Sequence, residues 1–155
     1  VDGIPLGPVM LSDLKAFVKA AGTVPFVAKG VLSVQDAVKC KEAGCQAIIV
    51  SHHHGRIPFG IAPLMVLSRI KEALKGSGIS IFVDCGIDSG YDAYKALALG
   101  ADAVAVGRGI LKPLLQQGSA GVKEKIQKMN EQLSELMMYT CVKDTRSFDA
   151  SVLYL

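Results

Sequence analysis

The sequence predicts an α/β fold in which about four parallel strands alternate with helices. Short apolar runs that fit strands alternate with amphipathic stretches of helical length, and 50% of the residues are hydrophobic, as expected when a sheet is covered on both faces. Two segments, 43–50 and 99–106, repeat one pattern of helix end, glycine turn and apolar strand. Because each crossover must return over the sheet, this alternation favours parallel strands.

The first helix and strand are expected before residue 29. Ser12 is a candidate N-cap for an amphipathic helix through about Ala21, and Gly22 ends that helix. The β-rich run Val24–Ala28 follows and is expected to form the first strand.

The second unit has the clearest boundary signals. Ser33 can cap a helix through about Ala43, and Gly44 ends it. The continuous apolar run Ala47–Val50 then predicts a buried strand. A polar loop, 51–62, comes after this strand.

The third unit begins at a proline. Pro63 suits the first turn of a helix that ends near Gly76, and Ile79–Val83 is the next expected strand. Residues Gly90–Leu99 are expected to be helical again, with Gly100 ending the helix.

The last expected strand is Ala103–Val106, and a long polar helix is expected from about Gly121 to Thr140. Residues 141–155 have the composition of a tail. Because no segment resembles a linker, we expect one domain over 1–155, with its core at about 24–140.

Length and the first residue indicate an incomplete unit. The chain has 155 residues, well short of the roughly 250 typical of an eight-stranded α/β barrel. It begins at Val1 without an initiator Met, so we expect a piece of a longer product. No apolar run approaches the roughly 18 residues of a membrane span and no signal-peptide pattern is present, so we expect no membrane association and a cytoplasmic location.

Charge and cysteine content argue against several classes of function. The net charge of +3 is spread along the chain and aromatic residues make up 6%, which does not favour a nucleic-acid surface. The cysteines show no CxxC pairing, and three of the four lie in apolar contexts, so we expect reduced thiols rather than metal ligands or disulfides. They are Cys40, Cys45, Cys85 and Cys141.

Polar clusters follow all of the expected strands. In a parallel α/β sheet the carboxyl ends of the strands share one face, where chemistry is assembled. A single polar residue there is ordinarily a solvated turn residue, whereas several clusters together predict a functional site. The clusters are Lys29-Gly30, Ser51-His52-His53-His54-Gly55-Arg56, Asp84-Cys85-Gly86-Ile87 and Gly107-Arg108-Gly109.

Two of these clusters have features of a phosphate site. Gly86 and Gly107 allow backbone N–H groups to approach an anion, a helix expected to start near Arg108 points its positive end at the same place, and Arg108 adds a charged donor. The alternative is that both glycines serve only as turn residues with positive φ.

The histidine-rich loop offers an acid–base group. His53 lies between polar neighbours, so its imidazole could act as a general base near neutral pH, and Arg56 offers a planar fork suited to a carboxylate. A solvated loop histidine is the alternative. A metal site from the consecutive His52, His53 and His54 is disfavoured, because adjacent side chains on an extended segment diverge.

These clusters resemble those of the FMN-dependent α-hydroxy-acid dehydrogenases and oxidases, a family that includes glycolate oxidase, lactate oxidase and flavocytochrome b2. The resemblance covers about residues 24–140. The similar segments are Val27-Ala28-Lys29-Gly30 (the strand-five Lys-Gly of the family), Ser51 to Arg56 (its Ser-Asn-His-Gly-Gly-Arg), Val83 to Ile87 (its Asp-Gly-Gly-Ile turn), and Ala96 to Val104 followed by Gly107-Arg108 (its last helix, strand and phosphate turn).

The resemblance implies a fold, a reaction and partners. The fold would be the C-terminal half, strands five to eight, of a TIM (β/α)8 barrel, completed by an N-terminal half from a separate or cleaved chain, or by a second copy. The reaction would be FMN-dependent oxidation of a small L-2-hydroxy acid, such as lactate or glycolate, to the 2-oxo acid. A non-catalytic FMN- or phosphate-binding half-barrel, or another FMN- or phosphate-binding barrel enzyme, remains the alternative.

The resemblance also implies roles for single residues. Lys29 would lie near the flavin N1–O2 edge, His53 would accept a proton from the substrate, and Arg56 would hold its carboxylate. The remaining cofactor-binding positions would be Ser51 and Asp84 on the flavin, with Asp84 on the ribityl hydroxyls, Cys85, Ile87 and Asp88 in the adjoining turn, and Gly86, Gly107 and Arg108 on the phosphate.

Some positions depart from the family pattern. Asp88 stands where the family usually places an Arg on the flavin phosphate, and Cys85 replaces a glycine. His52 and His54 replace an Asn and a Gly. The N-terminal half, which in the family supplies substrate-binding tyrosines and the acidic partner of the base, lies outside this sequence.

Overall fold

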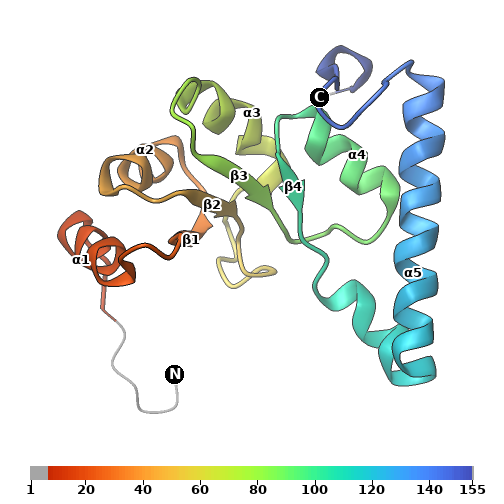
Figure 1. Cartoon of the computed structure of the whole chain (residues 1–155), viewed down its shortest axis with the longest axis horizontal. Coiled ribbons are helices and arrows are strands. Elements are labelled where there is room, and N and C mark those ends of the chain that lie inside the picture. The colour runs from red at the N-terminus through yellow and green to blue at the C-terminus, as the bar shows by residue number, and fades with distance from the viewer. Residues whose placement is uncertain (1–6, 155) are drawn as a thin grey trace.

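A computed structural model describes residues 7–154 of the chain, so Val1 and the last residue of the expected tail lie outside the described part. Its strands form one parallel sheet in the order β1-β2-β3-β4, and helices alternate with them (Figure 1). The strands are β1 (Val27–Val31), β2 (Ala47–Val50), β3 (Ser80–Val83) and β4 (Ala103–Val104). Each strand therefore pairs with the next one in the chain, as a repeated βα architecture requires.

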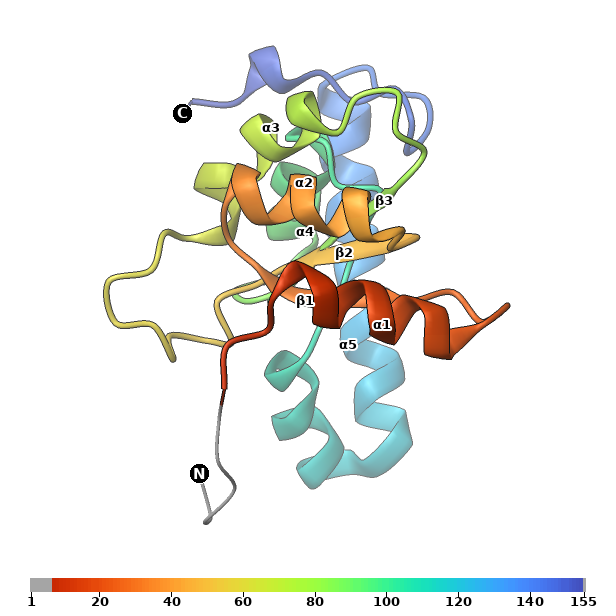
Figure 2. The same cartoon turned by 90° about the vertical axis from the view of Figure 1, so that its left-hand side faces the viewer.

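The helices pack on one another in chain order. Contacts join α1 to α2, α2 to α3, α3 to α4 and α4 to α5, so the helices form a continuous row beside the sheet (Figures 1 and 2). None of the helices in the described residues has the length and hydropathy to cross a membrane. The helices are α1 (Leu11–Ala21), α2 (Val34–Ala43), α3 (Pro63–Ala73), α4 (Gly90–Ala98) and α5 (Leu111–Tyr139), with short 3-10 helices η1 (Arg108–Ile110) and η2 (Ala150–Val152).

The structure confirms the predicted boundaries of the helix after Ser33 and of the strand that follows it. The Ser33 hydroxyl accepts a hydrogen bond from the Asp36 N–H at 3.0 Å, which caps α2, and Gly44 ends the helix with a φ of 89°. Strand β2 has the expected bounds, and its Ile48 and Val50 are fully buried.

The first strand lies further along the chain than its expected range, 24–28. Strand β1 begins at Val27 and continues through Lys29 and Gly30 to Val31. Lys29 pairs with Ile49 of β2, and the register shifts before Val31, at a left-handed Gly30. The expectation that Lys29 follows the strand was therefore wrong, because pairing with β2 carries the strand beyond its β-rich residues.

Several helix boundaries also differ from the expectation. Helix α1 begins one residue before Ser12, which is not its cap; the backbone N–H of Met10 instead donates to the Asp13 carboxylate at 2.8 Å. Helix α3 ends at Ala73, before Gly76. Strand β4 stops at Val104.

The long C-terminal helix begins ten residues earlier than the expected Gly121, at Leu111. Its helical path is broken at Gly118, where φ is 61° and ψ is −145°. As a result the first part of α5 folds back beside the second part (Figures 1 and 2). This fold-back places both parts of α5 near the ends of β3 and β4.

The core lies between the sheet and the row of helices. Burial raises the pKa of the Cys40 thiol to about 12, with smaller contributions from Cys45 and Asp36, and it also raises the pKa of Cys45. All four cysteines are free thiols in the described residues: Cys40 and Cys45 are buried, Cys85 is half-buried and Cys141 is exposed. The largest fully buried apolar side chains are Tyr94, Ile48, Leu67, Ile70, Ile81, Val50 and Val83.

Gly90 allows α4 to pack closely against α5. A Cβ added at Gly90 would overlap the Met129 carbonyl oxygen and lie 2.6 Å from the Leu133 nitrogen. We expect Gly90→Ala to lower the free energy of unfolding by about 1–3 kcal/mol, because overpacking forces the two helices apart. Chemical denaturation of the protein in its purified form measures this change. Gly7→Ala is the control, because open space surrounds that glycine, and equal losses in both variants would contradict the packing argument.

Candidate functional site

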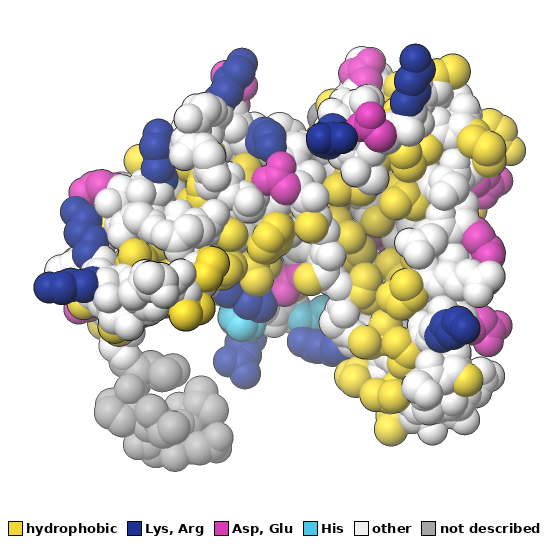
Figure 3. All heavy atoms as spheres, viewed as in Figure 1, with side chains coloured by type: hydrophobic (Ala, Val, Ile, Leu, Met, Phe, Trp, Pro, Cys, Tyr) yellow, Lys and Arg dark blue, Asp and Glu magenta, His cyan; other side chains and the backbone are white. Residues whose placement is uncertain are grey.

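A pocket of about 580 Å³ lies beyond the carboxyl ends of the strands. Figure 3 shows histidine and basic side chains gathered in this region, below the sheet in that view. Every strand-end cluster expected from the sequence contributes to the pocket wall. The lining residues are Lys29, His53, His54, 84–88, 105–109, Lys112 and Lys125.

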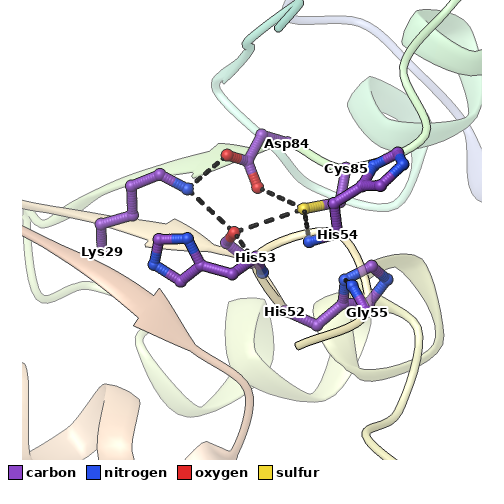
Figure 4. A network of polar contacts seen from close by, with 8 residues as sticks. Lys29, His52, His53, His54, Gly55, Asp84 and Cys85 are labelled. Carbon is purple, nitrogen blue, oxygen red and sulfur yellow. Dashed lines mark hydrogen bonds and ion pairs between the residues drawn. The ribbon is translucent and has the colours of Figure 1, made fainter. Parts of the chain in front are cut away.

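One polar network joins the ends of neighbouring strands at this pocket (Figure 4). The Lys29 ammonium on β1 donates to the Asp84 carboxylate at 2.5 Å and to the Ser51 hydroxyl at 2.9 Å. Ser51 follows β2 and is 1% exposed, while Asp84 follows β3. These hydrogen bonds hold the Lys29 ammonium in place. The Lys29 side chain is still 39% exposed and lines the pocket.

The network favours the ionised form of Asp84. Burial is the largest effect on this carboxyl and opposes its ionisation, but hydrogen bonds from Lys29, Ser51 and Cys85, with the charge of Lys29, together outweigh burial and lower the pKa of Asp84 below its usual 3.8. Lys29 and Asp84 therefore form a charged pair at neutral pH. Replacing either partner leaves the other charge only partly compensated.

Cys85 extends the network toward the histidine loop. Its thiol donates to the Asp84 carboxylate at 3.0 Å and accepts the backbone N–H of His54 at 3.3 Å. Cys85 has a φ of 67° and Gly86 a φ of 84°, so two consecutive left-handed residues turn the chain after β3. Such a conformation is strained for a residue with a Cβ, and strain of this kind concentrates at functional sites.

The histidine loop turns just as sharply. His53, His54 and Gly55 have φ values of 50°, 58° and 85°. The backbone N–H of His53 donates to the Ser51 hydroxyl at 3.2 Å, and the N–H of Gly55 donates to Nδ1 of His52 at 2.9 Å. His52 thus supports the loop, whereas His53 and His54 line the pocket, with the His53 ring on the Lys29 side of the network (Figure 4).

The opposite wall carries the two glycines named from the sequence. Gly86 has the left-handed φ of a turn glycine, but Gly107 has a φ of −95° and does not. A Cβ added at either glycine would meet no atom within 4 Å, so both backbones face open space in the pocket wall. Arg108 follows at the start of η1 and also lines the pocket. This wall can therefore admit a ligand close to the backbone, with a cation beside it.

Two of the named site residues lie outside the pocket wall. Arg56 is exposed in the loop after His53 and does not line the pocket. Ser51 is buried and does not line the pocket itself, but its hydroxyl contacts three residues that do, Lys29, His53 and Cys85. Within residues 7–154, no group of three or more His, Cys, Asp or Glu side chains is placed to hold a metal ion.

Sequence reasoning missed two cations in the pocket wall. Lys112 and Lys125 line it from the two parts of α5. In the sequence Lys125 is an ordinary lysine of the expected polar helix, Lys112 precedes that helix, and no motif marks either residue. Only the break at Gly118 brings these two parts of the helix to one place.

Comparison with known proteins gives one consistent family. The family model described as FMN-dependent dehydrogenase matches residues 8–155. The chain is 36% identical over 141 residues to the L-lactate oxidase of Roseobacter sp. (strain GAI101), and this alignment covers 90% of this chain and 37% of that protein. It is 40% identical over 121 residues to the 4-hydroxymandelate oxidase of Amycolatopsis orientalis, covering 77% of this chain and 34% of that protein.

A solved structure agrees with these sequence matches. The crystal structure of mandelate oxidase with (S)-4-hydroxymandelic acid superposes with a TM-score of 0.82 at 35% identity, covering 92% of this chain and 41% of that one. The chain thus spans less than half the length of the relatives that it matches.

The lowered pKa of Asp84 makes stability depend on pH. A carboxyl whose pKa is lower in the folded state adds stability above its unfolded value of 3.8, and this stability is lost as the pH falls through the folded pKa. We expect Asp84→Asn to lower the free energy of unfolding near neutral pH, and this loss should shrink as the pH falls through the folded pKa of Asp84 and the carboxyl becomes protonated. Denaturation across this pH range measures the difference.

The exposed pair of Lys15 and Glu42 provides the control for this experiment. Glu42→Gln should change the free energy of unfolding by less than about 1 kcal/mol, because exposed ion pairs are screened by water. A loss in Asp84→Asn that stays constant from neutral to acidic pH would contradict the assigned role of the charge.

Proposed function

The chain belongs to the family of FMN-dependent dehydrogenases, and we propose that it forms the base-carrying part of an enzyme that oxidises a small L-2-hydroxy acid to the 2-oxo acid, with FMN as cofactor. The observation that carries this proposal is the convergence of Lys29, Asp84 and His53 on one pocket at the strand ends. The relatives named for lactate and 4-hydroxymandelate oxidation support the substrate class.

The pocket residues fit FMN. The volume of the pocket, about 580 Å³, falls within the range of roughly 300–1,000 Å³ found for ligand sites. The open backbones of Gly86 and Gly107, with Arg108 beside them, suit the phosphate, and Asp84 suits the hydroxyls of the ribityl chain. When bound, FMN takes up the two electrons that the substrate loses.

Lys29 contributes a fixed positive charge to this chemistry. Its hydrogen bonds to Asp84 and Ser51 hold the ammonium at the pocket wall. A cation that is already in position stabilises negative charge that develops during the reaction without a cost of reorganisation. We assign this role to Lys29 toward the electron-accepting edge of the cofactor.

His53 is the proposed general base. Oxidation of a 2-hydroxy acid to a 2-oxo acid removes two electrons and two protons, and the imidazole of His53 would accept one of these protons at a ring nitrogen. The Ser51 hydroxyl holds the His53 backbone, so the network that orients Lys29 also positions the base. Arg56 would bind the substrate carboxylate by turning its long side chain toward the pocket.

The chain would act as the C-terminal half of a TIM barrel, with β1 to β4 as barrel strands five to eight. Its parallel sheet of consecutive strands supports this, and so does its coverage of less than half of each relative. The N-terminal half, from a separate or cleaved chain, is the proposed partner, with a second copy of this chain as the alternative. A half-barrel that holds FMN without turnover is the competing function, favoured by the position of Arg56 outside the pocket.

We expect His53→Ala to lower the rate of 2-hydroxy-acid oxidation by roughly a hundredfold to ten-thousandfold, the usual cost of removing a positioned general base. Steady-state kinetics with L-lactate on the assembled protein measures this. His52→Ala is the matched control, because His52 supports the loop and does not line the pocket. A larger loss in the His52→Ala or His54→Ala variant would reject the assignment of His53 as the base.

A folded monomer of 16.3 kDa is not expected in solution. Within residues 7–154, strands β1 and β4 each pair on one side only, and hydrophobic side chains are exposed across the face seen in Figure 3. Burying even about 1,000 Å² of apolar surface is worth on the order of 25 kcal/mol before entropic costs, more than the usual net stability of a domain, about 5–15 kcal/mol. A partner over this face is therefore strongly favoured.

Light scattering combined with intact mass and an absorption spectrum tests this expectation. A yellow complex that contains a second polypeptide would support the complete enzyme and exclude the lone half-barrel. A stable, folded species of 16.3 kDa without a second polypeptide would contradict the expected partner.

A further inference from the structure

The pocket carries a surplus of positive charge at the ends of β3 and β4. Lys29 and Asp84 pair with each other, which leaves three cations, Arg108, Lys112 and Lys125, against the single carboxylate of Asp88, a net charge of +2. Among the described residues, none of these four side chains takes part in an ion pair. Like charges gathered without partners repel one another, so this arrangement favours an anionic ligand.

Asp88 points into the same wall. A Cβ added at Gly109 would overlap Oδ1 of Asp88, so the carboxylate occupies the space that a side chain at 109 would need. Gly109 directly follows Arg108, and both residues line the pocket. The negative charge of Asp88 therefore lies beside the proposed phosphate site, where it would weaken anion binding unless other cations offset it.

Lys125 reaches this wall from the second part of α5. Its ammonium donates to the backbone carbonyl of Asp88 at 2.6 Å, which holds the charge at the turn after β3. Lys125 is half-buried and lines the pocket, whereas Lys123 and Lys128 of the same helix are exposed and do not. Lys112 reaches the wall from the first part of α5, on the other side of the break at Gly118.

We propose that Lys125 and Lys112, together with Arg108, bind the phosphate of FMN and offset the carboxylate of Asp88. The surplus of two positive charges matches a phosphate monoester, which carries a charge of about −1.5 to −2 at neutral pH. An ammonium has three donors, and Lys125 uses one of them on the Asp88 carbonyl. This inference rests on the proposed function and adds to it the residues that select a phosphorylated flavin.

The test compares affinity for FMN with affinity for riboflavin, which lacks the phosphate. The assembled protein is purified and its bound flavin is removed. The affinity of this protein for each flavin is then measured by the quenching of flavin fluorescence. Lys125→Gln and Lys112→Gln should each weaken FMN binding by roughly tenfold, as expected for loss of a charged contact that is partly screened, and should leave riboflavin binding unchanged. Lys128→Gln is the control and should change neither affinity.

A second variant gives an effect of the opposite sign. Asp88→Asn removes the opposing charge and should tighten FMN binding by severalfold without changing riboflavin binding. Because damage to the fold cannot raise affinity for one flavin alone, this result separates electrostatics from misfolding. The preference for FMN should also fall as the salt concentration rises.

Equal losses for FMN and riboflavin in the lysine variants would overturn the inference, and so would an Asp88→Asn variant with unchanged FMN affinity. A wild-type protein that binds the two flavins equally, or binds neither, would overturn it as well. Lysine-dependent FMN binding without oxidation of any 2-hydroxy acid would support this inference and contradict only the proposed function.

Discussion

The ion pair between Lys29 and Asp84 connects the sheet to the chemistry of the site. It joins the ends of β1 and β3 across the end of β2, and the Ser51 hydroxyl between them accepts from Lys29 and from the backbone of His53. One network therefore positions the cation, holds the carboxylate ionised and supports the proposed base. Because its members come from separate βα units, the site can form only when the strands are in register.

Strained turns surround this network. His53, His54 and Cys85 have left-handed backbones although each has a Cβ, at a cost of about 1–3 kcal/mol per residue. Hydrogen bonds within the network offset this cost: the Ser51 hydroxyl accepts from the His53 backbone, and the Cys85 thiol accepts from the His54 backbone and donates to Asp84. The turns bring His53 and His54 to the pocket while His52 stays in the loop as an acceptor for Gly55.

The other wall of the pocket depends on α5. The break at Gly118 returns the helix on itself, so that Lys112 and Lys125 approach Asp88 from two segments. Gly109 leaves the space that the Asp88 carboxylate occupies, and Lys125 bonds the carbonyl of the same residue. The carboxylate of Asp88 therefore lies in a wall that also carries Arg108, Lys112 and Lys125, and the pocket keeps a net positive charge.

The sequence by itself determined the alternation of strands and helices, the capped unit around Ser33 and Gly44, and the clusters at the strand ends, because caps, glycine turns and apolar runs act over a few neighbouring residues. It also predicted that Lys29, His53 and Asp84 lie in one pocket, because the carboxyl ends of parallel strands lie at the same edge of a sheet. Only the tertiary structure decided that β1 extends through Lys29, that Arg56 lies outside the pocket, and that Lys112 and Lys125 line it. These features depend on pairing with β2 and on the break at Gly118, which join residues far apart in the chain and leave no local pattern in the sequence.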